Sequence, residues 1–155
     1  ITREGYENLA NELDNRWRKE RPEVTSIGSW AASLGDRSEN ADYKYNKQRL
    51  REIDRRVRYI RKRLDGVRVV EYHSCQEGKV YFGCWVELVS SDEERLHFRV
   101  VGPDEIYGQS DYVSIDAPIA RACIGKREGD DVFVKTPLSE KTWHILKIWY
   151  EKPCR

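Results

Sequence analysis

The segment YKYNKQRLREIDRRVRYIRKRL, residues 43–64, decides the fold because its mostly apolar positions recur at one helical spacing. Alternate steps of three and four residues place these positions on the a and d edge of a coiled-coil helix. A helix over roughly residues 40–65 would be about 40 Å long. The residues of this edge are Tyr43, Asn46, Leu50, Ile53, Val57, Ile60 and Leu64.

A matching apolar edge precedes this segment and predicts the partner helix. It contains an additional four-residue step from Leu13 to Trp17, which resembles a coiled-coil stutter. Pro22 is expected to bend this helix, and Gly28 to weaken it. Because only residues 35–40 separate the two helices, they are predicted to form an antiparallel hairpin. The residues of this first edge are Tyr6, Leu9, Leu13, Trp17, Val24, Ile27, Ala31 and Leu34.

The pattern changes to alternating, β-branched runs after Gly66. These runs predict an antiparallel sheet. A short helix is expected within residues 117–125, with Asp116 as its cap and Gly125 at its end. The predicted fold is therefore α+β, with a coiled-coil hairpin over 1–66 and a globular domain over 67–155. The expected strands are 67–72, 78–89, 95–101, 111–116, 131–136 and 142–150.

Composition excludes several classes of protein. Five Trp and nine Tyr in 155 residues argue against a disordered chain, although 35% of the residues are charged. The four cysteines match neither a disulfide framework nor a zinc pattern. There is no apolar run of the ~20 residues that a membrane span needs. The sequence therefore predicts a soluble, cytoplasmic protein with reduced thiols.

Three carboxylates lie close together between the two predicted helices, in the sequence LGDRSENADY (34–43). In one interpretation they only cap the second helix, with Gly35 ending the first helix and Asp36 and Glu39 forming a capping box. Capping needs one carboxylate, however, and like charges held close repel unless a cation neutralises them. Asp36, Glu39 and Asp42 carry the hard oxygen atoms that Mg²⁺ prefers, so this acidic segment (residues 35–42) could complete a magnesium site on a partner enzyme.

Cations gather on one face of the second helix. The whole chain has a formal charge of +1, but residues 44–63 hold ten Lys and Arg against two acids. A face of one sign is typical of polyanion binding, although an ordinary solvated face is the alternative. Aromatic residues beside it are few, so base stacking is expected to contribute little. Helical spacing places on this face the basic stripe of Lys44, Lys47, Arg51, Arg55, Arg58 and Lys62.

The chain resembles the bacterial Gre transcript-cleavage factors, of the GreB type. Four segments carry this resemblance: GDRSENADY, the longer run from residue 30 to 64 that contains it, EGKVYFGCWVEL and DYVSIDAPIARA. This resemblance implies a C-terminal domain similar to FK506-binding proteins. It also implies a monomeric transcription elongation factor that binds RNA polymerase through its secondary channel. There it stimulates the polymerase's own cleavage of backtracked nascent RNA and rescues arrested complexes. No active site of its own and no tightly bound cofactor are expected.

The resemblance also assigns roles to residues. Asp36 and Glu39 match the pair that holds Mg²⁺ jointly with the polymerase and positions the attacking water, and Asp42 has at most a supporting role. The basic stripe matches the patch that contacts the 3′ segment of the nascent RNA. Asp116, Ala117 and Pro118 match the polymerase-docking segment, where Ala117 replaces the usual Ser. Two alternatives remain: a secondary-channel binder that inhibits polymerase without promoting cleavage, and a free-standing RNA- or DNA-binding protein.

Overall fold

The computed structural model describes residues 1–33 and 41–151, and the side chains of all of these except 28–33 and 42. The chain divides into two compact units. One unit comprises residues 6–67 and is helical. The other combines residues 1–5 with 68–155 and contains the sheet. Residues 1–5 were expected to belong to the hairpin, but they fall in the unit that contains the sheet. There the carboxylate of Glu105 accepts hydrogen bonds from the backbone N–H of Thr2, at 3.1 Å, and from the Thr2 hydroxyl.

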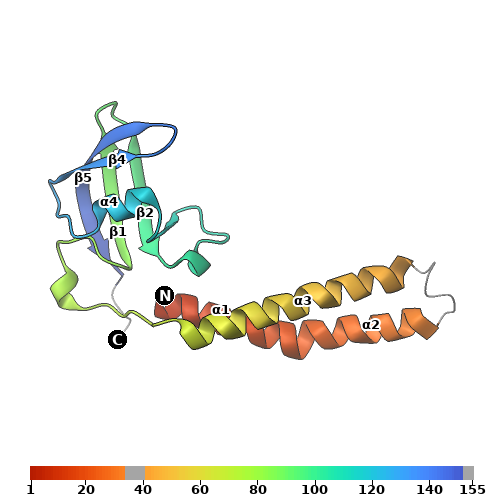
Figure 1. Ribbon diagram of the computed structural model, residues 1–155. Coiled ribbons are helices and arrows are strands. Elements are labelled where there is room, and N and C mark those ends of the chain that lie inside the picture. Colours follow the sequence, from red (N-terminus) through yellow and green to blue (C-terminus); the bar gives the residue numbers. More distant parts are fainter. Residues whose placement is uncertain (34–40, 152–155) are drawn as a thin grey trace. The chain divides into compact units, whose positions relative to one another are not determined.

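The helical unit contains the two expected chain segments (Figure 1). The first segment is helical throughout, as α1 (Arg3–Asn15), a π-helical turn (Arg16–Glu20) and α2 (Arg21–Ser33). The second is the single helix α3 (Ala41–Gly66), whose 26 residues span about 39 Å. Helices α2 and α3 lie side by side and run in opposite directions. The predicted long helix is thus present with nearly the expected bounds.

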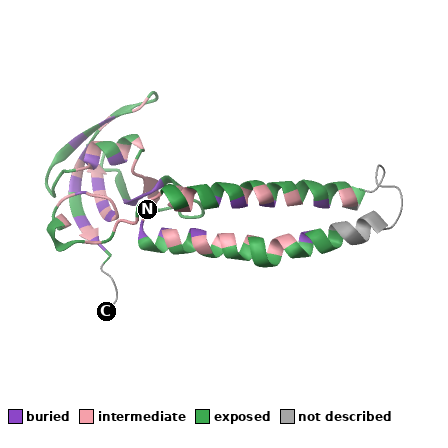
Figure 2. Cartoon of the chain, turned by 60° about the horizontal axis from the view of Figure 1, so that its bottom comes forward, coloured by how far each residue is buried: buried purple, intermediate pink, exposed green. Residues whose placement is uncertain are grey.

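The predicted apolar edge of α3 is its buried edge. Ile53, Val57 and Ile60 are at most 2% exposed, and Asn46 is also buried. Ile53 and Val57 form a cluster with Val24 of α2, against which Leu13 and Leu50 also pack. Figure 2 shows the buried positions of α3 recurring along one side of the helix. Burying each such side chain contributes about 1.5–3 kcal/mol, so this edge accounts for the association of the two helices.

The additional step near Trp17 takes a form that the sequence analysis did not predict. The N–H of Arg21 donates to the carbonyl of Arg16, five residues earlier, which is the bond of a π-helix. This wider turn ends two residues before Pro22, which has no N–H to donate. Trp17, which lies in this turn, is 43% exposed instead of lying in the apolar edge. Ile27, also expected in that edge, is 47% exposed.

The sheet unit has five strands in the order β3-β2-β1-β5-β4. The pairs β1–β2, β1–β5 and β4–β5 are antiparallel, as predicted, but β3 runs parallel to β2. Segments 67–72 and 78–83 were expected to be strands, and they lie outside the sheet. The strands are β1 (Cys84–Ser90), β2 (Arg95–Val101), β3 (Tyr112–Ser114), β4 (Asp131–Lys135) and β5 (Glu140–Tyr150).

Helix α4 (Pro118–Cys123) packs on one face of this sheet, and the core lies between them (Figure 1). Ala120 and Cys123 of α4 are fully buried against apolar residues of the strands, such as Val86 and Phe98. Two short 3-10 helices, Ser74–Gln76 and Pro103–Glu105, lie in the connections. The expected α+β architecture, with a helical region followed by a mainly antiparallel sheet and one short helix, is therefore confirmed.

Candidate functional site

The basic stripe forms an exposed face of α3. All six of its side chains are exposed, which agrees with the helical spacing. Among the side chains that the structure describes, no carboxylate forms an ion pair with any of the six. The ammonium of Lys47 lies 6.0 Å from the centre of the Tyr43 ring. These cations are therefore available to an external anion.

The other edge of the hairpin is neutralised internally. The guanidinium of Arg56 binds both carboxylate oxygens of Glu12, at 2.7 and 2.9 Å, and Arg16 binds the same carboxylate at 2.8 Å. The hydrogen bond from Arg56 lowers the pKa of Glu12 despite its partial burial. Arg49 lies 3.8 Å from Glu20. The contrast shows that the one-sign face is a particular property of the stripe and not of all the arginines of α3.

A groove lies beside the stripe, between the two helices. It has a volume of about 520 Å³, and the described residues that line it include five arginines but only one carboxylate, Asp54. That carboxylate accepts a hydrogen bond of 2.8 Å from Arg21. The guanidinium carbons of Arg21 and Arg61 lie 5.1 and 4.6 Å from the centre of the Trp17 ring. Trp17 was not expected beside the stripe, because its spacing from Leu13 placed it in the apolar edge of the first helix.

The acidic segment falls largely outside the described residues. Asp36 and Glu39, and the capping box that they were expected to form, lie outside the described residues. The roles of these two carboxylates therefore stay predictions. Asp42 belongs to the first turn of α3, although its side chain is not described. No group of three or more possible ligands for a metal ion occurs among the residues that the structure describes. The case for magnesium therefore rests on the oxygen chemistry of the carboxylates.

The expected docking residues form the exposed entry to α4. Asp116 and Pro118 are exposed, whereas Ala117 packs against the core. Asp116 was expected to cap α4, but Ala117 occupies the cap position and no side chain caps the helix. The carboxylate of Asp116 instead lies 3.9 Å from Arg121. Pro118 occupies the first turn, and Gly125 follows the helix with a φ of +81°, both as predicted.

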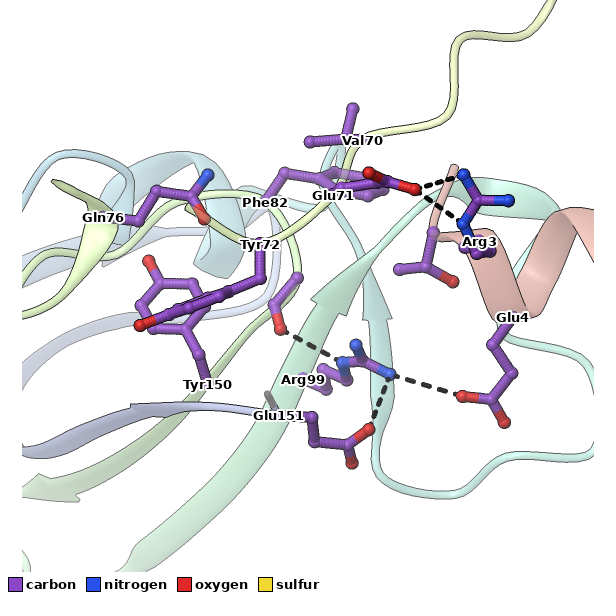
Figure 3. A pocket seen from close by; sticks show the side chains of 12 residues that line it. Arg3, Glu4, Val70, Glu71, Tyr72, Gln76, Phe82, Arg99, Tyr150 and Glu151 are labelled. Atoms are coloured by element: carbon purple, nitrogen blue, oxygen red, sulfur yellow. Dashed lines mark hydrogen bonds and ion pairs between the residues drawn. The ribbon is translucent and has the colours of Figure 1, made fainter. Parts of the chain in front are cut away.

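The sheet unit has a cavity of about 280 Å³ beside Arg99 (Figure 3). The buried Arg99 guanidinium donates to the carbonyl of Gly83 at 3.1 Å and lies 3.5 Å from Glu151 and 3.9 Å from Glu4. Figure 3 shows these partners converging on Arg99 and the separate pair of Arg3 with Glu71. Since both arginines of this cavity already lie beside carboxylates, it is a weaker candidate than the basic stripe.

The described cysteines are free thiols, as expected. Cys84 and Cys123 are buried, and burial raises their pKa values to about 12 and about 11. Cys75 is exposed. Among the helices of the described residues, none combines the length and apolar character needed to cross a membrane.

The fold and the site define a protein of two units, a helical hairpin with an exposed cationic face and a small, mainly antiparallel sheet domain. The particular family follows from comparison with known proteins. Residues 1–69 match the model described as transcription elongation factor, N-terminal, and residues 75–150 match the model described as transcription elongation factor, GreA/GreB, C-terminal. The chain belongs to this GreA/GreB family of transcription elongation factors, so the resemblance seen in the sequence is confirmed.

Similar proteins span nearly the whole chain. Transcription elongation factor GreB of Pseudomonas putida is 61% identical over 150 residues, which are 97% of this chain and 93% of the relative. GreB of Vibrio vulnificus strain YJ016 is 56% identical over 98% of this chain and 96% of the relative. Among solved structures, GreA factor homolog 1 of Thermus thermophilus is 26% identical over 96% of this chain and 97% of that chain, with a TM-score of 0.42.

Proposed function

We propose that this protein binds RNA polymerase and stimulates the polymerase's own hydrolysis of backtracked nascent RNA. The observation that carries the proposal is the basic stripe, a row of exposed cations on α3 without acidic partners among the described residues. RNA extruded by a backtracked polymerase is a single-stranded polyanion, and a row of exposed cations can bind its phosphates. The identity of 61% to a GreB elongation factor supports the same assignment.

The stripe and the acidic segment have separate tasks in this proposal. The stripe binds RNA phosphates along α3 and so holds the 3′ segment in place. Asp36 and Glu39 come shortly before α3 in the sequence, so the proposal assigns RNA binding and metal binding to neighbouring parts of the chain. These two carboxylates would hold Mg²⁺ jointly with the polymerase, and the bound ion would supply Lewis-acid activation of water. Asp42, in the first turn of α3, has a supporting role at most.

The protein is proposed to lack an active site of its own. Its carboxylates complete a site whose remaining ligands belong to the polymerase, which explains why isolated Asp36 and Glu39 need not bind Mg²⁺ tightly. It would act as a monomer, with the helical hairpin entering the secondary channel. Asp116 and Pro118, exposed at the entry of α4, would contact the polymerase, and Ala117 would shape that entry from the core side.

A second candidate function uses the same fold without catalysis. A secondary-channel binder could block the channel and inhibit polymerase. The retention of two carboxylates at positions 36 and 39 favours cleavage over inhibition. A free-standing RNA- or DNA-binding protein is the third candidate, and it predicts tight, polymerase-independent binding at moderate salt.

An assay on stalled elongation complexes tests the proposed function. We expect that replacing Asp36 and Glu39 by Ala abolishes the shortening of backtracked RNA while binding to polymerase is retained. Replacing Glu7 and Glu23 by Ala is the matched control, because both are exposed acids of the first helical segment and form no ion pair among the described residues. Unchanged RNA shortening by the first variant would refute the cleavage function. Inhibition of polymerase by the wild-type protein without any cleavage would favour the second candidate.

A further inference from the structure

We propose that the groove around Trp17 binds one nucleotide of single-stranded RNA. The base stacks on the indole of Trp17 or on the Arg61 guanidinium beside it, and arginines of the stripe hold the phosphate. This inference rests on the proposed function and adds a base-binding subsite to it. The basic stripe alone would bind only phosphates. The groove combines cations with an exposed indole, which is the combination that single-stranded nucleic acids favour.

The exposed indole lies in the π-helical turn. In a regular helix Trp17 would follow Leu13 in the apolar edge and would be covered by α3. The hydrogen bond from the N–H of Arg21 to the carbonyl of Arg16 accommodates an additional residue, and Trp17 lies within this wider turn. Exposing a large indole in place of burying it gives up hydrophobic stabilisation, and π-helical turns occur often at functional sites. The distortion therefore indicates a task for Trp17 other than packing.

The planar groups around the groove form a layered arrangement. The guanidinium carbons of Arg21 and Arg61 lie 5.1 and 4.6 Å from the Trp17 ring centre, within the distance of a cation–π contact. Nucleobases stack on both indole rings and guanidinium planes. Arg21 is held in place by its 2.8 Å hydrogen bond to Asp54, whereas Arg61 is exposed and forms no ion pair within the described part of the chain. A base can thus stack on Arg61 or replace it over the indole.

The charges of the groove supply the phosphate contacts. Arg51, Arg55 and Arg58 belong both to the stripe and to the lining of the groove. The only carboxylate of that lining, Asp54, is engaged by Arg21. The pocket on the opposite edge of the hairpin offers a contrast, because its Arg49 lies beside Glu20, and its lining includes Glu52 as well. Charge complementarity therefore assigns the anionic ligand to the Trp17 side.

Binding of a short single-stranded RNA to the full chain tests the subsite without polymerase. The probe is a fluorescently labelled oligouridylate, compared at low salt with an oligomer of the same length whose sugars lack bases. We expect Trp17→Leu to weaken binding of oligouridylate by at least about fivefold, the lower end of the effect of removing one stacking partner. The same variant should bind the abasic oligomer as well as the wild type does. Trp17→Phe keeps a ring and should retain most of the affinity, and Arg49→Ala on the opposite edge should leave the wild-type preference for oligouridylate over the abasic oligomer unchanged.

The outcomes separate this inference from the proposed function. Equal binding of oligouridylate by wild type and Trp17→Leu would overturn the subsite, and so would an equal loss of affinity for both probes. Failure of the wild type to bind oligouridylate at low salt would overturn it as well. The same variants are compared on stalled complexes, where cleavage dependent on Asp36 and Glu39 tests the proposed function alone. A loss in polymerase binding without a loss in RNA binding would assign the groove to a protein partner and would also overturn the inference. Circular dichroism and thermal unfolding confirm that Trp17→Leu folds.

Discussion

The number of phosphate contacts made by the basic stripe can be measured from the salt dependence of RNA binding. Replacing Arg55 and Arg58 by Ala removes two exposed guanidiniums that form no ion pair with the described carboxylates. Each phosphate contact to a single strand changes the slope of log K against log salt by about 0.7, so the double variant should lose about 1.4 from the slope. When the salt concentration rises from 50 to 200 mM, both proteins lose affinity for RNA. The factor by which the double variant loses affinity should be about seven times smaller than the factor for the wild type.

The assay is fluorescence anisotropy with a single-stranded RNA oligomer over a series of potassium chloride concentrations. The matched control replaces Arg18 and Arg49 by Ala, because this variant removes the same charge from residues that lie beside Asp14 and Glu20. The control should keep a slope close to that of the wild type. An equal decrease of the slope in both double variants would refute the assignment of the phosphate contacts to the stripe and would indicate only a general effect of net charge.

Three further predictions concern chemistry and stability. Iodoacetamide should modify the exposed Cys75 in the native protein and leave Cys84 unmodified, because burial raises the pKa of Cys84 to about 12. Mass spectrometry identifies the modified cysteines. Rapid modification of Cys84 in the native protein would contradict its burial. Ala117→Ser should add a side-chain cap to α4 and raise the free energy of unfolding by about 0.5–1 kcal/mol in a denaturant titration, whereas a decrease would show that the methyl group matters more for packing. The lowered pKa of Glu12 contributes stability that is present above pH 4.5 and is lost as the pH falls through the folded-state pKa. Glu12→Gln should therefore make the thermal unfolding temperature less sensitive to acid. An unchanged pH profile of that temperature would contradict the Arg56 contact.

The helical unit could be predicted in detail because its signal is local. Seven mostly apolar positions at alternating spacings of three and four fix a buried edge, and Ile53, Val57 and Ile60 are all buried as expected. The position of Trp17 could not be predicted in the same way. Its spacing from Leu13 fits an apolar edge, but Pro22 follows five residues later and cannot donate to the helix. That proximity of a stutter and a proline was the available signal for an irregular turn.

The sheet shows where sequence patterns lose information. Residues 67–72 alternate and contain three valines, which favours a strand, yet Val70 donates its N–H to the carbonyl of Ile1 and no strand forms. Strand pairing depends on such distant partners. The same holds for β3, whose three residues pair parallel to β2. A strand of this length has too few residues for its direction to be inferred from alternation.

The candidate site was predicted in part. The exposure of the basic stripe followed from helical angles, and the absence of acidic partners within the described residues could be anticipated from composition. The neutralised edge with Glu12 and Arg56 could not, since it depends on which faces of α1 and α3 meet. The acidic segment was recognised from its sequence alone, and the roles of Asp36 and Glu39 stay predictions.

The magnesium dependence of RNA cleavage tests the central claim most directly. Stalled elongation complexes are titrated with Mg²⁺ in the presence of the wild-type protein, of a variant with Asn at position 36 and Gln at position 39, or of no factor. If the two carboxylates help to hold the ion, the wild-type protein should lower the Mg²⁺ concentration for half-maximal RNA shortening, and the variant should leave it at the value without factor. The same half-maximal concentration in all three reactions would contradict the account.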